Sequence, residues 1–303
     1  MLNTNTIPEV SIIMPTYNRA GYIVETIESI RHQTYKTWEL IIVDDGSDDN
    51  TEEIVKNIID ERIQFYKAGR SGIGGKIKNE GIKKARGRFI AFIDSDDVWE
   101  QTKIEKQVNA LEQYSEAGFC LSGGFNFRTP YEPVEYFYKE REGVKVDRIF
   151  HSFFSSELPG FTQVLMLRKE CLVVTGLFKE EKSFSDLDFI LQLAWHFKAV
   201  TLYEPLLYRR LHDDSYSDPN WEKSYHEGID IIRSCKTKKM ATPKMACDAL
   251  YRLYINFGED CLLHKERKKA FACFFNAWKK DPSSIIPLKK MTKAIFKPLK
   301  TLH

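Results

Sequence analysis

The sequence predicts an α/β protein in which helices flank a mostly parallel central sheet. A pattern of strand, turn and helix repeats through the N-terminal part of the chain, which favours parallel strands joined by right-handed crossovers. The predicted strands are almost wholly apolar, as expected for a sheet that is covered on both faces. Polar clusters follow these strands directly, and open parallel sheets bind ligands beyond the carboxyl ends of their strands.

The first two strands are predicted over residues 10–14 and 40–43. The first runs into the breaker-rich turn PTYNR, and a helix over 21–33 follows, with isoleucines at helical spacing. The second strand ends in Asp44, Asp45, Gly46 and Ser47, and a helix over 51–59 follows. Each of these two strands is therefore followed directly by polar residues.

The third strand, over 63–66, precedes a glycine-rich loop, a helix over 76–86 and a fourth strand over 89–93. The loop sequence GRSGIGGK matches neither the P-loop nor the dinucleotide fingerprint in its spacing. Its glycines can still bring backbone N–H groups close to a phosphate. Beyond the fourth strand we predict helices over 101–114 and 187–197, strands over 118–122 and 200–203, and a helical region over 220–303.

The fourth strand ends in Asp94, Ser95, Asp96 and Asp97, which place three carboxyl groups at one strand terminus. Like charges at short range raise one another's pKa, so a hard divalent cation that prefers oxygen ligands explains the cluster. Asp94 and Asp96 project to the same side of an extended chain. The alternative is that the aspartates begin the next helix, and we expect Asp97 to cap that helix.

Composition favours a soluble cytoplasmic protein. The chain has 303 residues, of which 43% are hydrophobic, so it can bury a large core. No window approaches the roughly 20 apolar residues of a spanning helix, and the N-terminus does not resemble a signal peptide. The six cysteines form no C-x-x-C pair, which fits a reducing compartment. No nucleic-acid partner is expected.

The C-terminal residues 279–303 carry seven lysines against one aspartate, mixed with apolar residues. Such a tail can lie on an anionic membrane surface. The alternative is a solvated basic terminus. If the tail docks, the protein works at the inner face of the membrane and a lipid-linked acceptor becomes attractive.

Two stretches resemble glycosyltransferase family 2, a family of nucleotide-sugar-dependent enzymes with the GT-A fold. They are VSIIMPTYNRAGYIVETIESIRHQTYKTWELIIVDDGSDDNT and NEGIKKARGRFIAFIDSDDVW. The resemblance is close over about residues 10–115 and looser over 155–215. It implies a GT-A catalytic domain over 1–218, with a nucleotide-binding half over 1–115 and an acceptor half over 116–218. A helical C-terminal region with a basic tail then occupies 219–303.

The resemblance implies a set of residues for the nucleoside diphosphate sugar. Pro15 and Tyr17 would contact ribose and base, Asp45 would accept a hydrogen bond from the base, and Asp44 would assist at the ribose. Lys78 stands where relatives often carry arginine and would contact the pyrophosphate or the base. Arg70 is an independent cationic candidate. The alternatives are a core aromatic for Tyr17 and helix caps for Asp44 and Asp45.

The resemblance also implies a metal site and a general base. Asp94, Ser95 and Asp96 would hold Mn²⁺ or Mg²⁺ against the diphosphate, with Asp96 as the more direct ligand. Asp186 would take the proton of the acceptor hydroxyl, although this chain has Ser185 where the family usually has glutamate. Asp186 also suits the start of a helix. His212, in a segment that matches the family at Arg210, His212 and Ser215, would reach the metal or diphosphate, or else is a surface residue.

Together these features predict an inverting, metal-dependent glycosyltransferase that uses a nucleoside diphosphate sugar, with a UDP-sugar favoured as donor. The acceptor would be a glycan or a lipid-linked glycan in surface polysaccharide synthesis. A nucleotidyltransferase shares the strand-end carboxylates but needs a glycine-rich, lysine-containing N-terminal loop, which this sequence lacks. A non-catalytic scaffold that binds sugar nucleotides is the second alternative, favoured by Ser185 and the helical appendage.

Overall fold

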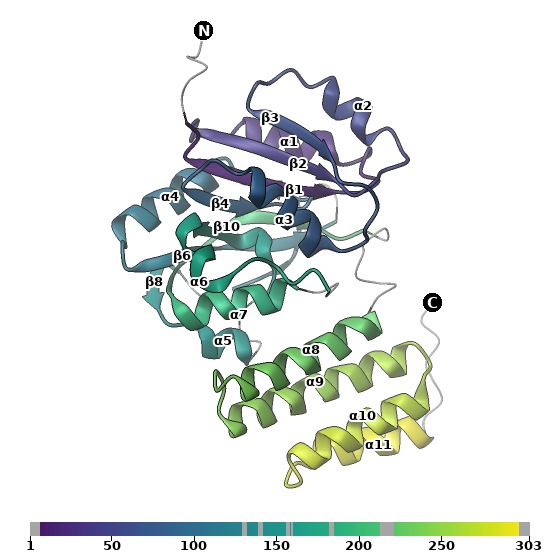
Figure 1. Ribbon diagram of the computed structural model, residues 1–303. Helices are drawn as coiled ribbons and strands as arrows, with labels where there is room; N and C mark the ends of the chain where they lie inside the picture. Colours follow the sequence, from purple (N-terminus) through teal and green to yellow (C-terminus); the bar gives the residue numbers. More distant parts are fainter. Residues whose placement is uncertain are drawn as a thin grey trace. The chain divides into compact units, whose positions relative to one another are not determined.

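The chain divides into two compact units in the computed structural model (Figure 1). One unit comprises Met1–Phe153 and Leu158–Ser215, and the other comprises Phe154–Glu157 and Tyr216–His303. None of the helices in the described part of the chain is long and apolar enough to cross a membrane. The structure describes residues 7–128, 132–138, 142–155, 158, 160–181, 185–212 and 221–296.

The strands of the first unit form one sheet. Its main path runs in the order β3, β2, β1, β4, β9, β6, β10 and β5, while β7 pairs with β6 and β8 pairs with β10. The bounds are β1 Val10–Thr16, β2 Trp38–Asp44, β3 Ile63–Lys67, β4 Phe89–Phe92, β5 Val98–Trp99, β6 Ala117–Phe127, β7 Pro133–Tyr136, β8 Val144–Asp147, β9 Leu165–Arg168 and β10 Lys198–Arg210.

The predicted α/β fold with a central sheet flanked by helices is confirmed, and the sheet is mixed, with most of its parallel strands gathered in the N-terminal part. Strands β3, β2, β1 and β4 are all parallel, so their carboxyl ends meet at one edge. Strand β9 is antiparallel to both β4 and β6, and β6 is parallel to β10. Strands β1, β2 and β4 are buried almost throughout, as their apolar sequences predict for a sheet covered on both faces. The carboxyl ends of these four strands are therefore brought together.

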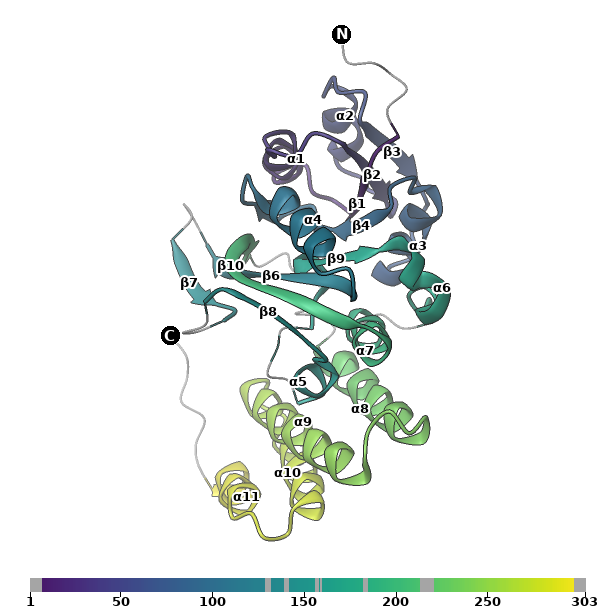
Figure 2. The same ribbon diagram turned by 90° about the vertical axis from the view of Figure 1, so that its left-hand side faces the viewer.

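The helices of the first unit cover both faces of the sheet. Figure 2 shows α1 and α4 on one face and α3 on the other. Right-handed crossovers require this, because the chain moves outward from β1 to β3 and then returns to β4. The bounds are α1 Ile23–Arg31, α2 Thr51–Lys56, α3 Gly74–Lys84, α4 Lys103–Gln113, α5 Phe150–Phe154, α6 Leu172–Thr175 and α7 Asp186–His196, with 3₁₀ turns η1 at Thr162–Val164 and η2 at Lys169–Cys171.

Some element boundaries differ from the prediction. The strand predicted over 200–203 is longer in the structure, because β10 continues to Arg210 and pairs with β6 as far as that residue. Helix α3 starts at Gly74, so two of the glycines assigned to the loop lie in its first turn. The middle segment without a predicted structure contains β7, β8 and α5. Pairing with distant strands decides the bounds of β7, β8 and β10, which a local pattern does not report.

The second unit is helical. Its elements are α8 Trp221–Thr237, α9 Pro243–Leu263, α10 Arg267–Lys280 and α11 Ile286–Phe296. Thr242 caps α9, since its side chain accepts a hydrogen bond from the Met245 N–H, and proline occupies the first turn. The core of this unit is formed by Phe257, Cys261, Ala270, Cys273, Phe274, Met291 and Ala294.

Candidate active site

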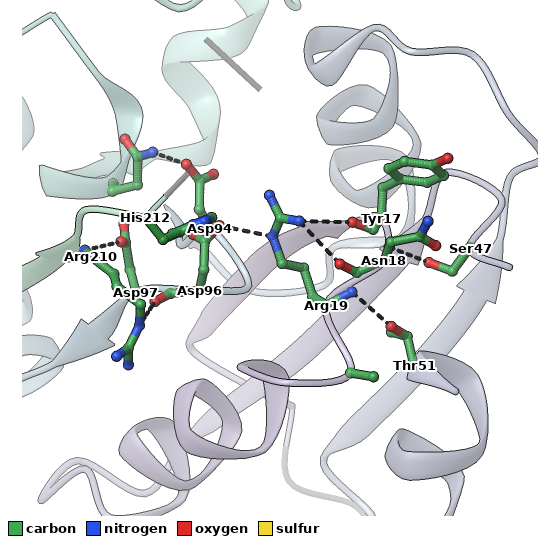
Figure 3. Close-up of polar contacts among 12 residues, drawn as sticks. Tyr17, Asn18, Arg19, Ser47, Thr51, Asp94, Asp96, Asp97, Arg210 and His212 are labelled. Atoms are coloured by element: carbon green, nitrogen blue, oxygen red, sulfur yellow. Dashed lines mark hydrogen bonds and ion pairs between the residues drawn. The ribbon is translucent and has the colours of Figure 1, made fainter. Parts of the chain in front are cut away.

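The turns that follow β1 and β2 are tied together by hydrogen bonds (Figure 3). Asn18 adopts a left-handed conformation with φ of 50°. Its backbone N–H donates to Ser47 Oγ at 2.9 Å, and its side chain exchanges two hydrogen bonds with Asp48. The Arg19 N–H donates to Thr51 Oγ1 at 2.9 Å. The two turns therefore form one platform at the edge of the sheet.

On this platform, Tyr17, Asp45 and Arg70 lie together. The Arg70 guanidinium lies 3.6 Å from the centroid of the Tyr17 ring and donates to the Asp45 carboxylate. Asp45 is buried and also accepts from the backbone N–H groups of Ser71, at 2.6 Å, and Gly72, at 2.8 Å. The glycine-rich loop thus supplies donors to Asp45, and Tyr17 offers a ring face to a planar group.

The contacts of Asp44 and Pro15 lie within the turn and the strand that contain them. Asp44 is buried, and both the N–H and the hydroxyl of Ser47 donate to its carboxylate. Asp44 therefore shapes the turn after β2, and neither it nor Asp45 caps α2, whose N-cap residue is Asn50. Pro15 lies within β1 opposite Val43.

Asp94, Asp96 and Asp97 form the acidic cluster after β4, and one carboxylate oxygen from each lies within 4.8 Å of the others. The expectation that Asp97 caps the next helix is wrong, because α4 begins at Lys103 with Thr102 as its N-cap residue. Asp97 instead accepts a hydrogen bond from the Arg210 N–H at 3.0 Å. The end of β10 therefore closes one side of the cluster.

The other two aspartates are held by residues from distant segments. Figure 3 shows Arg19 between Asp96 and the backbone carbonyls of Tyr17 and Asn18. Arg19 Nε lies 2.9 Å from Asp96 Oδ2, and His212 Nε2 lies 3.1 Å from the same oxygen. Asp94 accepts a hydrogen bond from the Gln163 side chain in η1.

The surroundings perturb the three carboxyl groups in different directions. Burial, reinforced by the charges of Asp96 and Asp186, raises the pKa of Asp94 despite Lys78 and Gln163. Burial and the charges of its two neighbours raise the pKa of Asp97 well above its usual value. Burial also acts on Asp96, but the hydrogen bond from His212 and the charge of Arg19 outweigh it, so its pKa is lowered. The cluster therefore favours an additional positive charge.

The cluster fits a hard divalent cation. Its donors are carboxylate oxygens, which Mg²⁺ and Mn²⁺ prefer. Asp97 Oδ2 is buried and has no hydrogen-bond partner among the residues that the structure describes. Ser95, which the sequence grouped with Asp94 and Asp96, is buried within the same turn. A cation beside Asp94 and Asp96 would offset the repulsion among the three carboxylates.

Asp186 is the first residue of α7 and is held by two side chains. Lys78 Nζ, from α3, lies 2.8 Å from each of its carboxylate oxygens. Thr162 Oγ1 donates to Asp186 Oδ2 at 2.9 Å and accepts from Lys78 Nζ at 2.8 Å. In the structure, Lys78 therefore forms an ion pair with Asp186. The second aspartate of this helix start, Asp188, pairs instead with Lys179 at 2.8 Å.

Two short segments connect these groups into one site. Residues 17–19 touch Arg70 at one end and Asp96 at the other. Thr162 and Gln163 are adjacent in the chain, and they contact Asp186 and Asp94 respectively. The predicted nucleotide, metal and base residues therefore converge, although they come from segments far apart in the sequence.

Arg19, Thr162, Gln163 and Arg210 belong to this site but were not assigned a role from the sequence. Arg19 lies in the PTYNR turn directly after the first strand, and this position at a strand end could have identified it as a site residue. Thr162 and Gln163 lie in the stretch 155–215 that resembles the family more loosely, and that resemblance was the signal that could have drawn attention to them. The Ser185 hydroxyl is buried without a described partner, and Ser215, expected near His212, lies outside the described residues.

Comparisons with known proteins relate the chain to a family of glycosyltransferases. The family model described as Glycosyl transferase family 2 matches residues 11–175. TuaG of Bacillus subtilis, named as a glycosyltransferase of teichuronic acid biosynthesis, is 31% identical over 224 residues, which cover 72% of this chain and 85% of TuaG. Escherichia coli WfgD is named a UDP-Glc:alpha-D-GlcNAc-diphosphoundecaprenol beta-1,3-glucosyltransferase. It is 44% identical over 106 residues, which cover 34% of this chain and 40% of WfgD.

Among solved structures, S. aureus TarS 1-349 in complex with UDP-GlcNAc superposes with a TM-score of 0.69 at 18% identity. The match covers 94% of this chain and 89% of that chain, so the two share the GT-A fold. Fold, family model and relatives lead to one assignment: the chain belongs to glycosyl transferase family 2 and is a glycosyltransferase.

Proposed function

We propose that this protein is an inverting, metal-dependent glycosyltransferase that moves a sugar from a UDP-sugar to a glycan or lipid-linked acceptor for a cell-surface polysaccharide. The convergence of Tyr17, the acidic cluster and Asp186 on one site supports this proposal most directly. The names of TuaG and WfgD, which refer to teichuronic acid and to a UDP-glucose donor with an undecaprenol-linked acceptor, point the same way.

The nucleoside would bind on the platform after β1 and β2. The Tyr17 ring offers a stacking face, and Asp45 offers a carboxylate that suits an N–H donor such as that of uracil. Arg70 occupies the Tyr17 face in the structure and would share it with the base or move aside. Pro15 and Asp44, at the ends of β1 and β2, would lie beside the ribose.

Asp94 and Asp96 would hold Mn²⁺ or Mg²⁺, with Asp97 beside them. When bound, the ion would supply Lewis-acid stabilisation of the negative charge that develops on the departing diphosphate. Arg19 and His212 orient the Asp96 carboxylate, since both contact its Oδ2 atom. Gln163 orients Asp94 in the same way.

Asp186 would act as the general base. The acceptor oxygen forms a bond to the anomeric carbon as the bond to the diphosphate breaks, and the hydroxyl proton passes to Asp186. A carboxylate suffices, because the hydroxyl becomes more acidic as it attacks an oxocarbenium-like carbon. Attack from the face opposite the diphosphate inverts the anomeric configuration.

The acceptor would approach from the side of η1. Phe161 precedes Thr162, and its ring meets the Phe137 ring edge to face with centroids 5.0 Å apart. The Arg209 guanidinium lies 5.4 Å from the Phe161 centroid. Aromatic faces pack on the apolar faces of sugar rings, and arginine suits the phosphate of a lipid-linked acceptor.

The basic end of the second unit would contact an anionic membrane surface at the inner face of the cell membrane. Helix α11 buries Met291 and Ala294 but exposes Leu288 and Ile295, which lie close to exposed lysines on the helix. Apolar side chains beside lysines are typical of helices that lie on anionic lipid. Sedimentation with vesicles containing phosphatidylglycerol tests this, and equal binding to neutral vesicles or none at all would contradict it.

The test of the proposed activity is nucleotide release from a panel of UDP-, GDP- and dTDP-sugars with Mn²⁺, comparing the native protein with Asp186→Asn. We expect release of UDP by the native protein and a loss of at least a hundredfold in the variant. A non-catalytic scaffold would release no nucleotide from any donor. A nucleotidyltransferase would release pyrophosphate when given a nucleoside triphosphate and a sugar phosphate.

A further inference from the structure

The ammonium group of Lys78 is committed to Asp186 and Thr162. Lys78 is buried, with 5% of its surface exposed, and its three contacts are Asp186 Oδ1, Asp186 Oδ2 and Thr162 Oγ1, each at 2.8 Å. A lysine ammonium carries three N–H donors. All three are therefore used, and none is left for a diphosphate in this arrangement.

The packing of α3 explains why Lys78 reaches Asp186. Gly75 and Lys78 are three residues apart and so lie on one face of the helix. A Cβ atom at Gly75 would overlap the Ser185 hydroxyl, so the glycine allows α3 to approach the start of α7. One turn later, Lys78 meets the residue that follows Ser185.

Asn79, the next residue, ties the same helix to the backbone of Phe178. Its side-chain amide donates to the Phe178 carbonyl at 2.9 Å and accepts from the Phe178 N–H at 3.0 Å. Both groups are buried, so this reciprocal pair is shielded from water. The Lys78 side chain therefore extends from a backbone that cannot easily shift.

We propose that Lys78 and Thr162 are positioning residues for Asp186, the proposed general base. Their three contacts hold the Asp186 carboxylate so that one of its oxygens faces the acceptor. An ionised carboxylate has about four lone-pair sites. Lys78 and Thr162 occupy two sites on Oδ2, and Lys78 occupies one on Oδ1. The remaining site is on Oδ1, which is the atom that receives the acceptor proton. This inference rests on the proposed role of Asp186.

The experiment compares Thr162→Val with Thr162→Ser, and Lys78→Met with the native protein. Steady-state UDP release is measured with the best donor of the panel, and UDP affinity is measured by calorimetry with Mn²⁺. Valine matches threonine in shape but lacks the hydroxyl, whereas serine keeps it. We expect Thr162→Val and Lys78→Met to lower kcat by about tenfold or more, because each removes hydrogen bonds to a charged group. UDP affinity should stay within about twofold, and Thr162→Ser should keep most of kcat.

The outcomes separate this inference from the proposed function. If Lys78→Met weakens UDP binding and leaves kcat intact, Lys78 acts on the donor and the inference is overturned. If Thr162→Val matches Thr162→Ser in kcat, the hydroxyl has no positioning role, and this arm remains decisive even if Lys78→Met does not fold. If Asp186→Asn keeps full turnover, or the native protein releases no UDP, the proposed function itself fails and the inference fails with it.

Discussion

The guanidinium of Arg70 lies 3.6 Å above the Tyr17 ring while it donates a hydrogen bond to Asp45. This arrangement joins the turn after β1 to the glycine-rich loop after β3. It also shows that the Tyr17 ring accepts a planar cationic group on one face. A nucleobase on the same platform would meet the ring, the carboxylate and the guanidinium together.

Replacing the ring of Tyr17 should weaken nucleotide binding. Stacking of a base on an aromatic side chain contributes about 1–3 kcal/mol, so we expect Tyr17→Ala to lower UDP affinity by roughly fivefold to 150-fold. Tyr17→Phe keeps the stacking face and should bind UDP as the native protein does. Calorimetry with UDP and Mn²⁺ measures both, and equal affinity in Tyr17→Ala would show that the base binds elsewhere.

Removing the charge of Asp96 should uncouple nucleotide binding from the metal. Asp96 and Asp94 are the proposed ligands, so Mn²⁺ should raise UDP affinity in the native protein and have about tenfold less effect in Asp96→Asn. UDP titrations with Mn²⁺ or with a chelator give this comparison. Glu112→Gln, an exposed surface change, is the control. An undiminished Mn²⁺ effect in Asp96→Asn would place the metal outside the cluster.

Lys103 should make stability depend on pH. It is fully buried against Trp99 and Gln107, and burial lowers its pKa to about 7. Above this value the folded protein releases the proton, whereas the unfolded chain keeps it up to about pH 10.4. The free energy of unfolding should therefore rise with pH across this window, by about 2 kcal/mol from pH 7 to 9.

Lys103→Met is the matched control, because methionine fills a similar volume without a titrating group. Chemical denaturation at both pH values should give a smaller rise for Lys103→Met than for the native protein. The same rise in both proteins would mean that other groups set the pH dependence.

Gly81 should not tolerate a side chain. It faces β1 from within α3, and a Cβ atom there would lie 2.5 Å from Ile13 Cγ2. We expect Gly81→Ala to destabilise the protein by about 1–3 kcal/mol through overpacking. Gly74, in the first turn of the same helix, has open space around it, so Gly74→Ala should be neutral or slightly stabilising. Thermal unfolding of the two variants tests the contrast, and equal melting temperatures would contradict it.

Much of the site could be predicted because its residues stand directly after strands. Asp45 follows β2 and the acidic cluster follows β4. The carboxyl ends of parallel strands meet at one edge of the sheet, and this does not depend on how the helices pack. The apolar strands and the helical spacing between them are local patterns, and they identify the α/β class. A family resemblance then added roles for Tyr17 and Asp186.

The partners of these residues could not be predicted in the same way. Asp97 was expected to cap a helix, but the end of β10 receives its carboxylate instead. Lys78 was expected to contact the diphosphate or the nucleobase, yet it contacts Asp186, which lies 108 residues further along the chain. Arg19 had no assigned role and contacts Asp96 from 77 residues away.

The sequence by itself therefore determined the fold class, the strand ends and the kind of chemistry gathered there, because these depend on hydrophobic periodicity and residue type. The tertiary structure alone decided which side chains meet: Lys78 with Asp186, Arg19 with Asp96, and Gln163 with Asp94. The physical reason is the short distance over which these interactions act. A hydrogen bond or an ion pair acts over a few ångströms, and only the packing of α3, η1 and β10 around the sheet brings such distant residues within that reach.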